Sequence, residues 1–297
     1  MPWHLAEAAA GGVAAVALSL AALATHDLDR SAVAEPATVT IRATRLPFPE
    51  PGEFLVEGRP IPAPLRDAAV PAFRIMTHQV SLADYGRCVA AGRCMAADAA
   101  APDAAPEAAI DVPATGVSHF DALAYAAWLG EATGATWRLP SALEAAAAAG
   151  ERFAAETFSD AADDPKNPAV AWIRRYRDEA AARRPVDPEP KRFGHYGVNA
   201  LGIADFGGNV WEWTSTCYVR VSFDTDRVTE RGRTENCRVH VLEGRHRAIM
   251  SDFVRDGRSG GCAVGTPPDN LGFRLVREPG RPLVARLAHR VAGFVGR

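Results

Sequence analysis

Short helices separated by proline- and glycine-rich sequence set the strongest limit on how this chain can fold. A serine followed three residues later by an acidic residue occurs at Ser81–Asp84, Ser118–Asp121 and Ser141–Glu144. Such a pair satisfies backbone N–H groups in the first turn of a helix, and a glycine commonly follows the last turn. Gly92, Gly134 and Gly150 stand where each helix should end. The sequence predicts three short helices, the second with an apolar stripe of Phe120, Leu123, Ala124, Ala127 and Trp128.

The rest of the chain favours short strands and ordered loops. Prolines at 47, 49, 51, 60, 62, 64 and 71 limit that stretch to short or edge strands. We expect a linker at 26–45, one compact α+β domain of low regular secondary structure at 46–278, and a basic amphipathic tail at 279–297. The tail places Leu283, Leu287, Val291 and Phe294 along one stripe, which would pack on the domain or rest on an anionic membrane surface.

Composition and charge exclude several classes of protein. Of 297 residues, 48% are hydrophobic and 23% are charged, which is typical of a globular chain and not of a disordered one. The 33 basic residues against 36 acidic ones give a net charge of −3. A nucleic-acid binder needs a basic surface that displaces counterions from phosphates, so nucleic acid is not an expected partner.

The first residues predict export. Leu5–Ala24 is apolar except for Glu7 and Ser19, and residues 1–25 read as a signal peptide or a membrane anchor. No Lys or Arg precedes the run, which fits neither form well. We expect a periplasmic protein, either soluble after cleavage or attached to the inner membrane through residues 5–24.

Cysteine spacing agrees with an oxidising compartment. Four of the five cysteines form two local pairs, Cys88 with Cys94 and Cys217 with Cys237, and Cys262 is left over. Disulfides persist outside the cytosol, so we expect both pairs to be bonded. Cys262 is either a small buried hydrophobic residue or a functional thiol.

A set of motifs in a fixed order identifies the fold. Asp205-Phe-Gly-Gly-Asn-Val-Trp-Glu-Trp213, followed by Asn270-Leu-Gly-Phe-Arg274, resembles the formylglycine-generating-enzyme family, also called the sulfatase-modifying-factor domain. Earlier landmarks of the same family are Pro51–Phe54, Thr77–Val80, Gly116–Ser118, Asp121–Ala122 and Thr136–Ser141. The resemblance implies a single domain with little regular secondary structure and a C-type-lectin-like topology.

The resemblance also implies a structural calcium ion. Calcium prefers several hard oxygen ligands, and two glycines at 207 and 208 let backbone carbonyls turn inward. By similarity to the family's calcium loop, the ligands would be the side chains of Asp205 and Glu212 and the carbonyls of Gly208 and Val210. The alternative is a metal-free loop in which Trp211 and Trp213 are core residues.

The redox chemistry of the family is where this sequence departs. Formylglycine-generating enzymes oxidise a substrate cysteine at a copper ion held by two cysteines upstream of the Gly-Phe-Arg motif, because thiolates suit Cu(I). Residues 246–261 contain no cysteine, so formylglycine synthesis is not expected, and the presence of copper or iron stays open. The chain is most similar to two exported branches that lack this pair, one for pyoverdine maturation and one encoded with copper nitrite reductases.

A polar cluster replaces the copper ligands. It contains Arg245, His246, Arg247, Asp252, Arg255, Asp256 and Arg258. A histidine near carboxylates can act as a general base or bind a metal, and arginines can bind an anionic group. We therefore take His246, Asp252 and Cys262 as candidate catalytic residues, and Arg245, Arg247, Arg255 and Arg258 as candidate substrate-binding residues. The alternative is an internal network of salt bridges.

Two functions follow from these observations. The first is an exported oxidoreductase-type maturation factor that acts on a peptide or protein substrate. The second is a non-catalytic accessory module that assists assembly of an exported metalloenzyme such as copper nitrite reductase. Fold alone does not decide between them, because one fold hosts both catalysts and binders.

Overall fold

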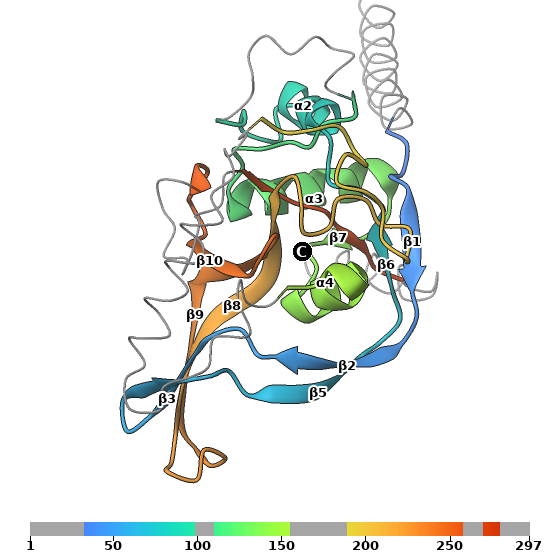
Figure 1. The fold of residues 1–297 in the computed structure, drawn as a ribbon. Coiled ribbons are helices and arrows are strands. Elements are labelled where there is room, and N and C mark those ends of the chain that lie inside the picture. The colour runs from blue at the N-terminus through green and yellow to red at the C-terminus, as the bar shows by residue number, and fades with distance from the viewer. Residues whose placement is uncertain (1–32, 99–109, 155–188, 258–269, 280–297) are drawn as a thin grey trace, which may run out of the picture.

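The computed structural model describes residues 33–98, 110–154, 189–257 and 270–279, which form three β-sheets with short helices packed against them (Figure 1). The first strands are β1 (Thr38–Ile41), β2 (Thr44–Pro49), β3 (Glu53–Val56), β4 (Arg59–Ile61), β5 (Leu65–Val70), β6 (Phe73–Met76) and β7 (Trp137–Arg138). The later ones are β8 (Trp211–Phe223), β9 (Glu230–Glu243), β10 (Ala248–Ser251), β11 (Leu271–Gly272) and β12 (Val276–Arg277). Most strands are short, as the prolines and glycines predict, and the α+β fold class is confirmed.

Strand pairing joins distant parts of the chain. One sheet has the order β1-β6-β12-β7, and β2 pairs with β5 in a separate two-stranded sheet. The largest sheet has the order β10-β9-β8-β3-β4, and β11 pairs with β8 in parallel. The pairing of β11 with β8 places residues 271–272 of the motif Asn270–Arg274 next to residues 211–212 of the motif Asp205–Trp213.

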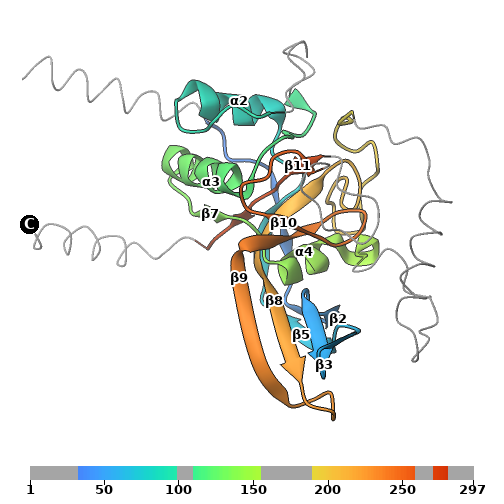
Figure 2. The same ribbon diagram turned by 90° about the vertical axis from the view of Figure 1, so that its left-hand side faces the viewer.

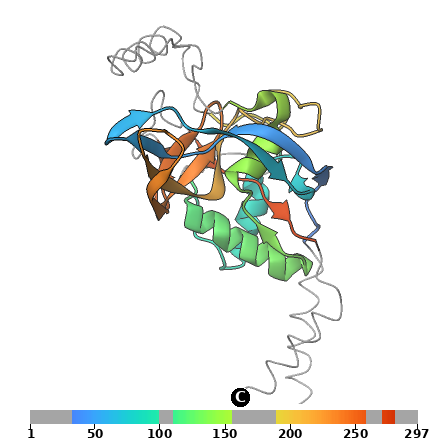
Figure 3. The same ribbon diagram turned by 90° about the horizontal axis from the view of Figure 1, so that it is seen from below.

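The three predicted helices are present with their predicted caps. They are α2 (Leu82–Ala90), α3 (His119–Thr133) and α4 (Ala142–Ala149), the last followed by the 3₁₀ turn η3 (Gly150–Arg152). Ser81, Ser118 and Ser141 each accept a hydrogen bond from the backbone N–H three residues on. Figures 1 and 2 place α2 next to α3, and α4 near β2 and β5; Figure 3 shows the same body from below.

The buried face of α3 is not the apolar stripe that the sequence indicates. His119, Ala122, Tyr125, Ala126 and Leu129 are buried, whereas Phe120 and Leu123 are 46% and 43% exposed. The helix has apolar residues on two sides, so hydrophobic periodicity alone does not show which side is buried. Trp128 is the member of the predicted stripe that lies in the core.

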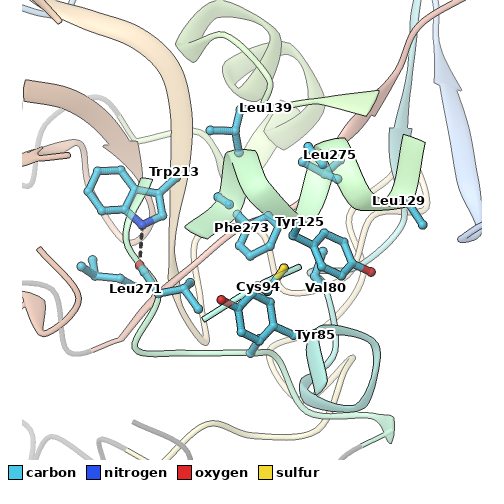
Figure 4. Packing of buried hydrophobic residues seen from close by; sticks show 14 of the residues in the cluster. Val80, Tyr85, Cys94, Tyr125, Leu129, Leu139, Trp213, Leu271, Phe273 and Leu275 are labelled. Carbon is cyan, nitrogen blue, oxygen red and sulfur yellow. Dashed lines mark hydrogen bonds between the residues drawn. The ribbon is translucent and has the colours of Figure 1, made fainter. Parts of the chain in front are cut away.

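Aromatic side chains fill the main core between α2, α3 and β8. Figure 4 shows Tyr85, Tyr125, Trp213 and Phe273 in this cluster. Tyr125 contacts Phe273 edge to face, with ring centroids 5.5 Å apart, and Trp213 donates a hydrogen bond to the Val117 carbonyl at 2.8 Å. The tryptophans of the first motif are thus core residues. A second cluster packs α4 against β1 and β6.

The β8–β9 hairpin extends beyond the other elements at its turn (Figures 1 and 2). A disulfide between Cys217 and Cys237 joins its two strands, and a second disulfide joins Cys88 to Cys94 after α2. Both predicted pairs are confirmed.

The folded body begins earlier than the sequence suggests. Residues 26–45 were expected to form a linker, but β1 at Thr38–Ile41 pairs with β6, and β2 begins at Thr44. Alternation of threonine with valine and isoleucine in this stretch suits a strand. The predicted signal or anchor and residues 280–297 of the predicted tail lie outside the described residues. Within the described ranges, none of the helices has the length and apolar character that crossing a bilayer requires.

Candidate functional site

A buried ion pair connects the two most informative motifs. Arg274 donates from Nε and Nη2 to the two carboxylate oxygens of Glu212 at 2.5 and 2.6 Å. Gln79 adds a third hydrogen bond to Glu212 at 2.8 Å. All three side chains are buried, and the Arg274 guanidinium lies 4.7 Å from the ring centre of Phe206. This network fixes β8, the residues after β11 and those after β6 in one position.

The loop before β8 is held by the Asp205 carboxylate. Its two oxygens accept hydrogen bonds from the backbone N–H groups of Gly194 and Tyr196 at 2.6 and 2.8 Å. Asp205 and Asn209 both have positive φ angles, 56° and 49°, which shows how tightly the loop turns.

The two carboxylates predicted as calcium ligands differ in how many hydrogen bonds they already accept. Each oxygen of Asp205 accepts one hydrogen bond here, which leaves it a lone pair for a cation. Glu212 accepts three hydrogen bonds and its charge faces Arg274, so it has one lone pair to offer. The hydrogen bonds of the loop thus leave Asp205 freer than Glu212 to bind the calcium ion that the resemblance implies.

His246 lies in the interior and not at an open surface. It is 4% exposed, its Nδ1 lies 2.9 Å from the Arg247 carbonyl, and its ring meets Trp211 edge to face at 5.6 Å. The Trp211 indole also donates to the His246 carbonyl at 3.1 Å. Arg245 lies over the other side of this contact, 5.5 Å from the Trp211 ring centre. His246 and Trp211 thus pack against each other in the interior.

Arg247 is the centre of a second buried ion pair. Its Nε donates to Glu243 at 2.8 Å and its Nη1 to the Pro49 carbonyl at 2.7 Å. The guanidinium also lies 4.9 Å from the ring centre of Phe48 and 5.5 Å from that of Phe153. Burial raises the pKa of Glu243 to about 7, and this effect outweighs the opposing influence of Arg247.

Two further members of the predicted cluster, Arg255 and Asp252, are also held in ion pairs. Arg255 binds Asp98 at 2.8 Å and the capping carboxylate of Asp121 at 2.7 Å. Asp252 is 2% exposed, and its Oδ2 lies 3.2 Å from Nη1 of Arg238, a residue that the sequence did not single out. Arg258 and Cys262 lie outside the described residues. Three described members of the predicted cluster, Arg247, Asp252 and Arg255, are therefore held in separate ion pairs.

The structure brings together two histidines that sequence spacing keeps apart. His119, the first residue of α3, stacks on His240 of β9 with ring centroids 3.6 Å apart, and its ring meets Trp213 edge to face. The backbone N–H of His119 donates to the Asp252 carbonyl at 3.1 Å. Three buried atoms in this group have no hydrogen-bond partner: His119 Nε2, His240 Nδ1 and Asp252 Oδ1. Such a concentration of unsatisfied atoms calls for an explanation.

Burial keeps both histidines neutral at physiological pH. It lowers the pKa of His119 to about 4, with a further contribution from the neighbouring His240. Burial also lowers the pKa of His240, although Asp252 and backbone carbonyls act in the opposite direction. No local pattern reveals this pair, because the two histidines lie far apart in the sequence. Strand pairing positions His240 on β9, and His119 begins α3.

Exposed apolar side chains lie on the two segments that carry His119 and Asp252. Phe120 and Leu123 lie on α3, and Phe253, which is 67% exposed, follows Asp252. The Arg238 guanidinium lies 5.5 Å from the ring centre of Phe120 and pairs with Asp252, so it joins the two segments. We call Phe120, Leu123, Arg238 and Phe253 the aromatic face.

Comparison with known proteins gives two kinds of relatives. Inactive C-alpha-formylglycine-generating enzyme 2 of Bos taurus and that of Mus musculus are each 29% identical over 181 residues, 58% of this chain. The chain spans about half the length of these relatives, 52% and 51%.

Similar solved structures have lower identities. PvdO from Pseudomonas aeruginosa has a TM-score of 0.48 and 21% identity over 82% of this chain and 95% of its own. Treponema denticola variable protein 1 has a TM-score of 0.47 and 14% identity over 84% and 97% of the two chains. CarF has a TM-score of 0.43 and 14% identity over 84% and 100%.

The family model is the broadest match. The sulfatase-modifying factor enzyme 1-like domain matches residues 28–279, which contain every described helix and strand. Its coverage agrees with the ordered series of motifs from Pro51 to Arg274, which the structure joins at the Glu212–Arg274 pair. This chain therefore belongs to the formylglycine-generating-enzyme, or sulfatase-modifying-factor, domain family.

Proposed function

We propose that this chain is a non-catalytic accessory protein that binds a peptide or protein partner in an exported compartment. The observation that carries the proposal is that, within the described residues, three of the side chains expected to act on a substrate are held in ion pairs of the chain itself. Arg247 pairs with Glu243, Arg255 with Asp98 and Asp121, and Asp252 with Arg238. The Arg247–Glu243 and Arg255–Asp121 pairs are largely buried, so redirecting either arginine toward a ligand would leave a buried carboxylate uncompensated.

The aromatic face is the surface that we propose for the partner. Aromatic side chains and arginine are enriched where proteins bind one another, and large apolar residues left exposed often mark such sites. Phe120 and Phe253 are 46% and 67% exposed on segments that the His119–Asp252 hydrogen bond holds together. The face is thus preorganised, which lowers the entropic cost of binding.

Two further observations support an exported binder. The two disulfides suit an oxidising compartment such as the periplasm. The curated relatives carry the word inactive in their names, although this chain spans only about half of them. We keep calcium at the Asp205 loop as a proposal, and its loss in an Asp205→Ala variant is the corresponding test by elemental analysis.

One observation favours a catalytic alternative. The unsatisfied nitrogens of His119 and His240 and the unsatisfied oxygen of Asp252 are buried on the segments that carry the aromatic face or next to them. An imidazole nitrogen without a hydrogen-bond partner can accept a proton if a substrate group reaches it, although the pKa of about 4 makes His119 a weak base. In that case Arg238, whose side chain is 73% exposed, would have to move off Asp252 first.

Complementation of a host that lacks the gene distinguishes the two functions. The variants are Phe120→Ala with Phe253→Ala, which alters the aromatic face, and His119→Phe with Asp252→Asn, which removes the acid–base groups. Exported proteins are compared by abundance and by intact mass. We expect the aromatic-face variant to fail, the acid–base variant to complement, and the dependent protein to keep its covalent mass. A chain-dependent change in that mass, abolished by His119→Phe with Asp252→Asn, would establish catalysis instead.

A further inference from the structure

The disulfide of the β8–β9 hairpin has a carboxylate beside it. Cys217 Sγ, Cys237 Sγ and a carboxylate oxygen of Glu235 all lie within 4.8 Å of one another. Among the described residues, this is the one set of three potential ligands drawn from His, Cys, Asp and Glu that lie so close together. Glu235 and Cys237 are exposed and Cys217 is half-buried, so solutes can reach the group.

We propose that reduction of this disulfide creates a binding site for a thiophilic metal cation such as Zn²⁺. A thiol reductant takes the disulfide to two thiols and is itself oxidised to a disulfide. The cation then displaces one proton from each thiol and binds the thiolates of Cys217 and Cys237 with the carboxylate of Glu235. Two sulfurs and one oxygen form a ligand set that zinc accepts, and the fourth position stays open to water or to a ligand from another molecule.

The distances suit this ligand set. With bonds of about 2.3 Å to sulfur and 2.0–2.2 Å to oxygen, tetrahedral ligands lie roughly 3.6–3.8 Å apart. The sulfurs must separate to that distance, and the oxygen already lies within 4.8 Å of both. Only a small rearrangement is therefore needed after reduction.

The strand register allows this rearrangement. Trp213 pairs with Leu242, Cys217 with His240 and Tyr218 with Asn236, with register shifts between these positions. Residues 214–216 and 237–239 thus fall between paired positions of the β8–β9 ladder. Cys237 can move as part of a bulge while the regular pairs on both sides stay in place.

The carboxylate favours metal binding over thiol–disulfide exchange. A negative charge beside a thiol disfavours the thiolate, and exchange depends on thiolates as nucleophile and leaving group. A bound divalent cation reduces this difficulty, because it offsets two of the three negative charges on the thiolates and the carboxylate. Glu235 is therefore better explained as a ligand than as part of a redox centre.

The second disulfide provides an internal control. Cys88 and Cys94 are 0% and 9% exposed, and no such three-ligand set includes them among the described residues. Reduction of this pair should not create a comparable site. The proposal is also independent of the aromatic face, so failure of one does not bear on the other.

Cobalt binding tests the proposal, because Co²⁺ reports thiolate ligation by its charge-transfer absorption. All proteins carry Cys262→Ser. Each is reduced, and the reductant is then removed under anaerobic conditions. We expect one Co²⁺ per chain in the reduced protein, displaced by Zn²⁺, and no thiolate absorption in the oxidised protein. Glu235→Gln should weaken binding about tenfold or more, whereas Cys88→Ser with Cys94→Ser should leave it unchanged.

A second variant avoids reduction altogether. Cys237→His cannot form the disulfide but keeps a metal ligand, and Cys88–Cys94 stays oxidised. We expect Cys237→His to bind Co²⁺ in non-reducing buffer much more tightly than Cys237→Ser. The proposal is overturned if both the reduced protein and Cys237→His lack thiolate absorption, or if Glu235→Gln binds like the parent protein.

Discussion

Arg274 and Glu212 form a bidentate ion pair in the interior. Arg274 is the last residue of the motif Asn270–Arg274, and Glu212 lies on β8 in the motif Asp205–Trp213. Arg274 is 0% exposed and Glu212 is 3% exposed, so water stabilises neither charge. The pair thus explains in physical terms why two motifs almost sixty residues apart occur together. Each supplies the charge that the other requires.

Removal of one partner should be strongly destabilising. We expect Arg274→Met to lower the free energy of unfolding by about 3–5 kcal/mol, because Glu212 stays buried without compensation. Arg274→Met combined with Glu212→Gln should recover part of this loss. Urea denaturation of the three proteins measures the effect, with the exposed Arg220–Glu53 pair as control through Arg220→Met. A loss in Arg274→Met no larger than in Arg220→Met would contradict this account.

Local signals in the sequence were sufficient for much of the fold. The serine–acid pairs predicted all three helices, because the cap is formed within four residues. The close spacing of Cys88 and Cys94 likewise predicted their bond. The apolar stripe of α3 misled, since Phe120 and Leu123 lie on the opposite side from Tyr125 and the core.

The candidate site depended on contacts that no local pattern contains. His119 and His240 meet because β9 and the turn after β10 pack against the start of α3. The partner of Asp252 is Arg238, which the β9–β10 pairing brings close. The sequence singles out a group of polar residues near the Gly-Phe-Arg motif, but it does not predict which residue each of them contacts.

Thiol counting checks the disulfide assignment. Denatured protein that has not been reduced should react with a maleimide at one cysteine, Cys262, because the other four form two disulfides. After reduction all five cysteines should react. Peptide mapping identifies the labelled residue. Labelling of Cys217 or Cys237 without reductant would contradict the structure of the hairpin.

Glu243 should make stability fall as the pH rises. Its folded-state pKa of about 7 lies above the ordinary value of 4.5. The unfolded chain therefore loses this proton first, and the folded state is progressively disfavoured between about pH 4.5 and 7. We expect Glu243→Gln to abolish this component of the pH dependence, although it leaves Arg247 unpaired at every pH.

Urea midpoints from pH 4.5 to 8 measure the effect, and Glu144→Gln is the matched control. Burial alone would raise the pKa of Glu144, but its bonds to Arg138 and Ser141 lower it overall. Stability from Glu144 is therefore present above its ordinary pKa of 4.5 and lost only in more acidic solution, so Glu144→Gln should leave the shape of the curve from pH 4.5 to 8 unchanged. Parallel pH curves for Glu243→Gln and the parent protein would disprove the assignment.

The histidine pair should make the protein sensitive to acid. The folded-state pKa of His119 is about 4, below its ordinary value of 6.5, so the unfolded chain binds a proton first as the pH falls. Stability should thus decline from about pH 6.5 towards pH 4, and the lowered pKa of His240 acts in the same direction. His119→Phe keeps a flat ring against His240 and Trp213 and removes the proton-binding group. We expect it to flatten the acid limb of the stability curve, whereas His195→Phe, which changes an exposed histidine, should leave that limb unchanged. Equal acid sensitivity in both variants would show that the stacked pair does not control it.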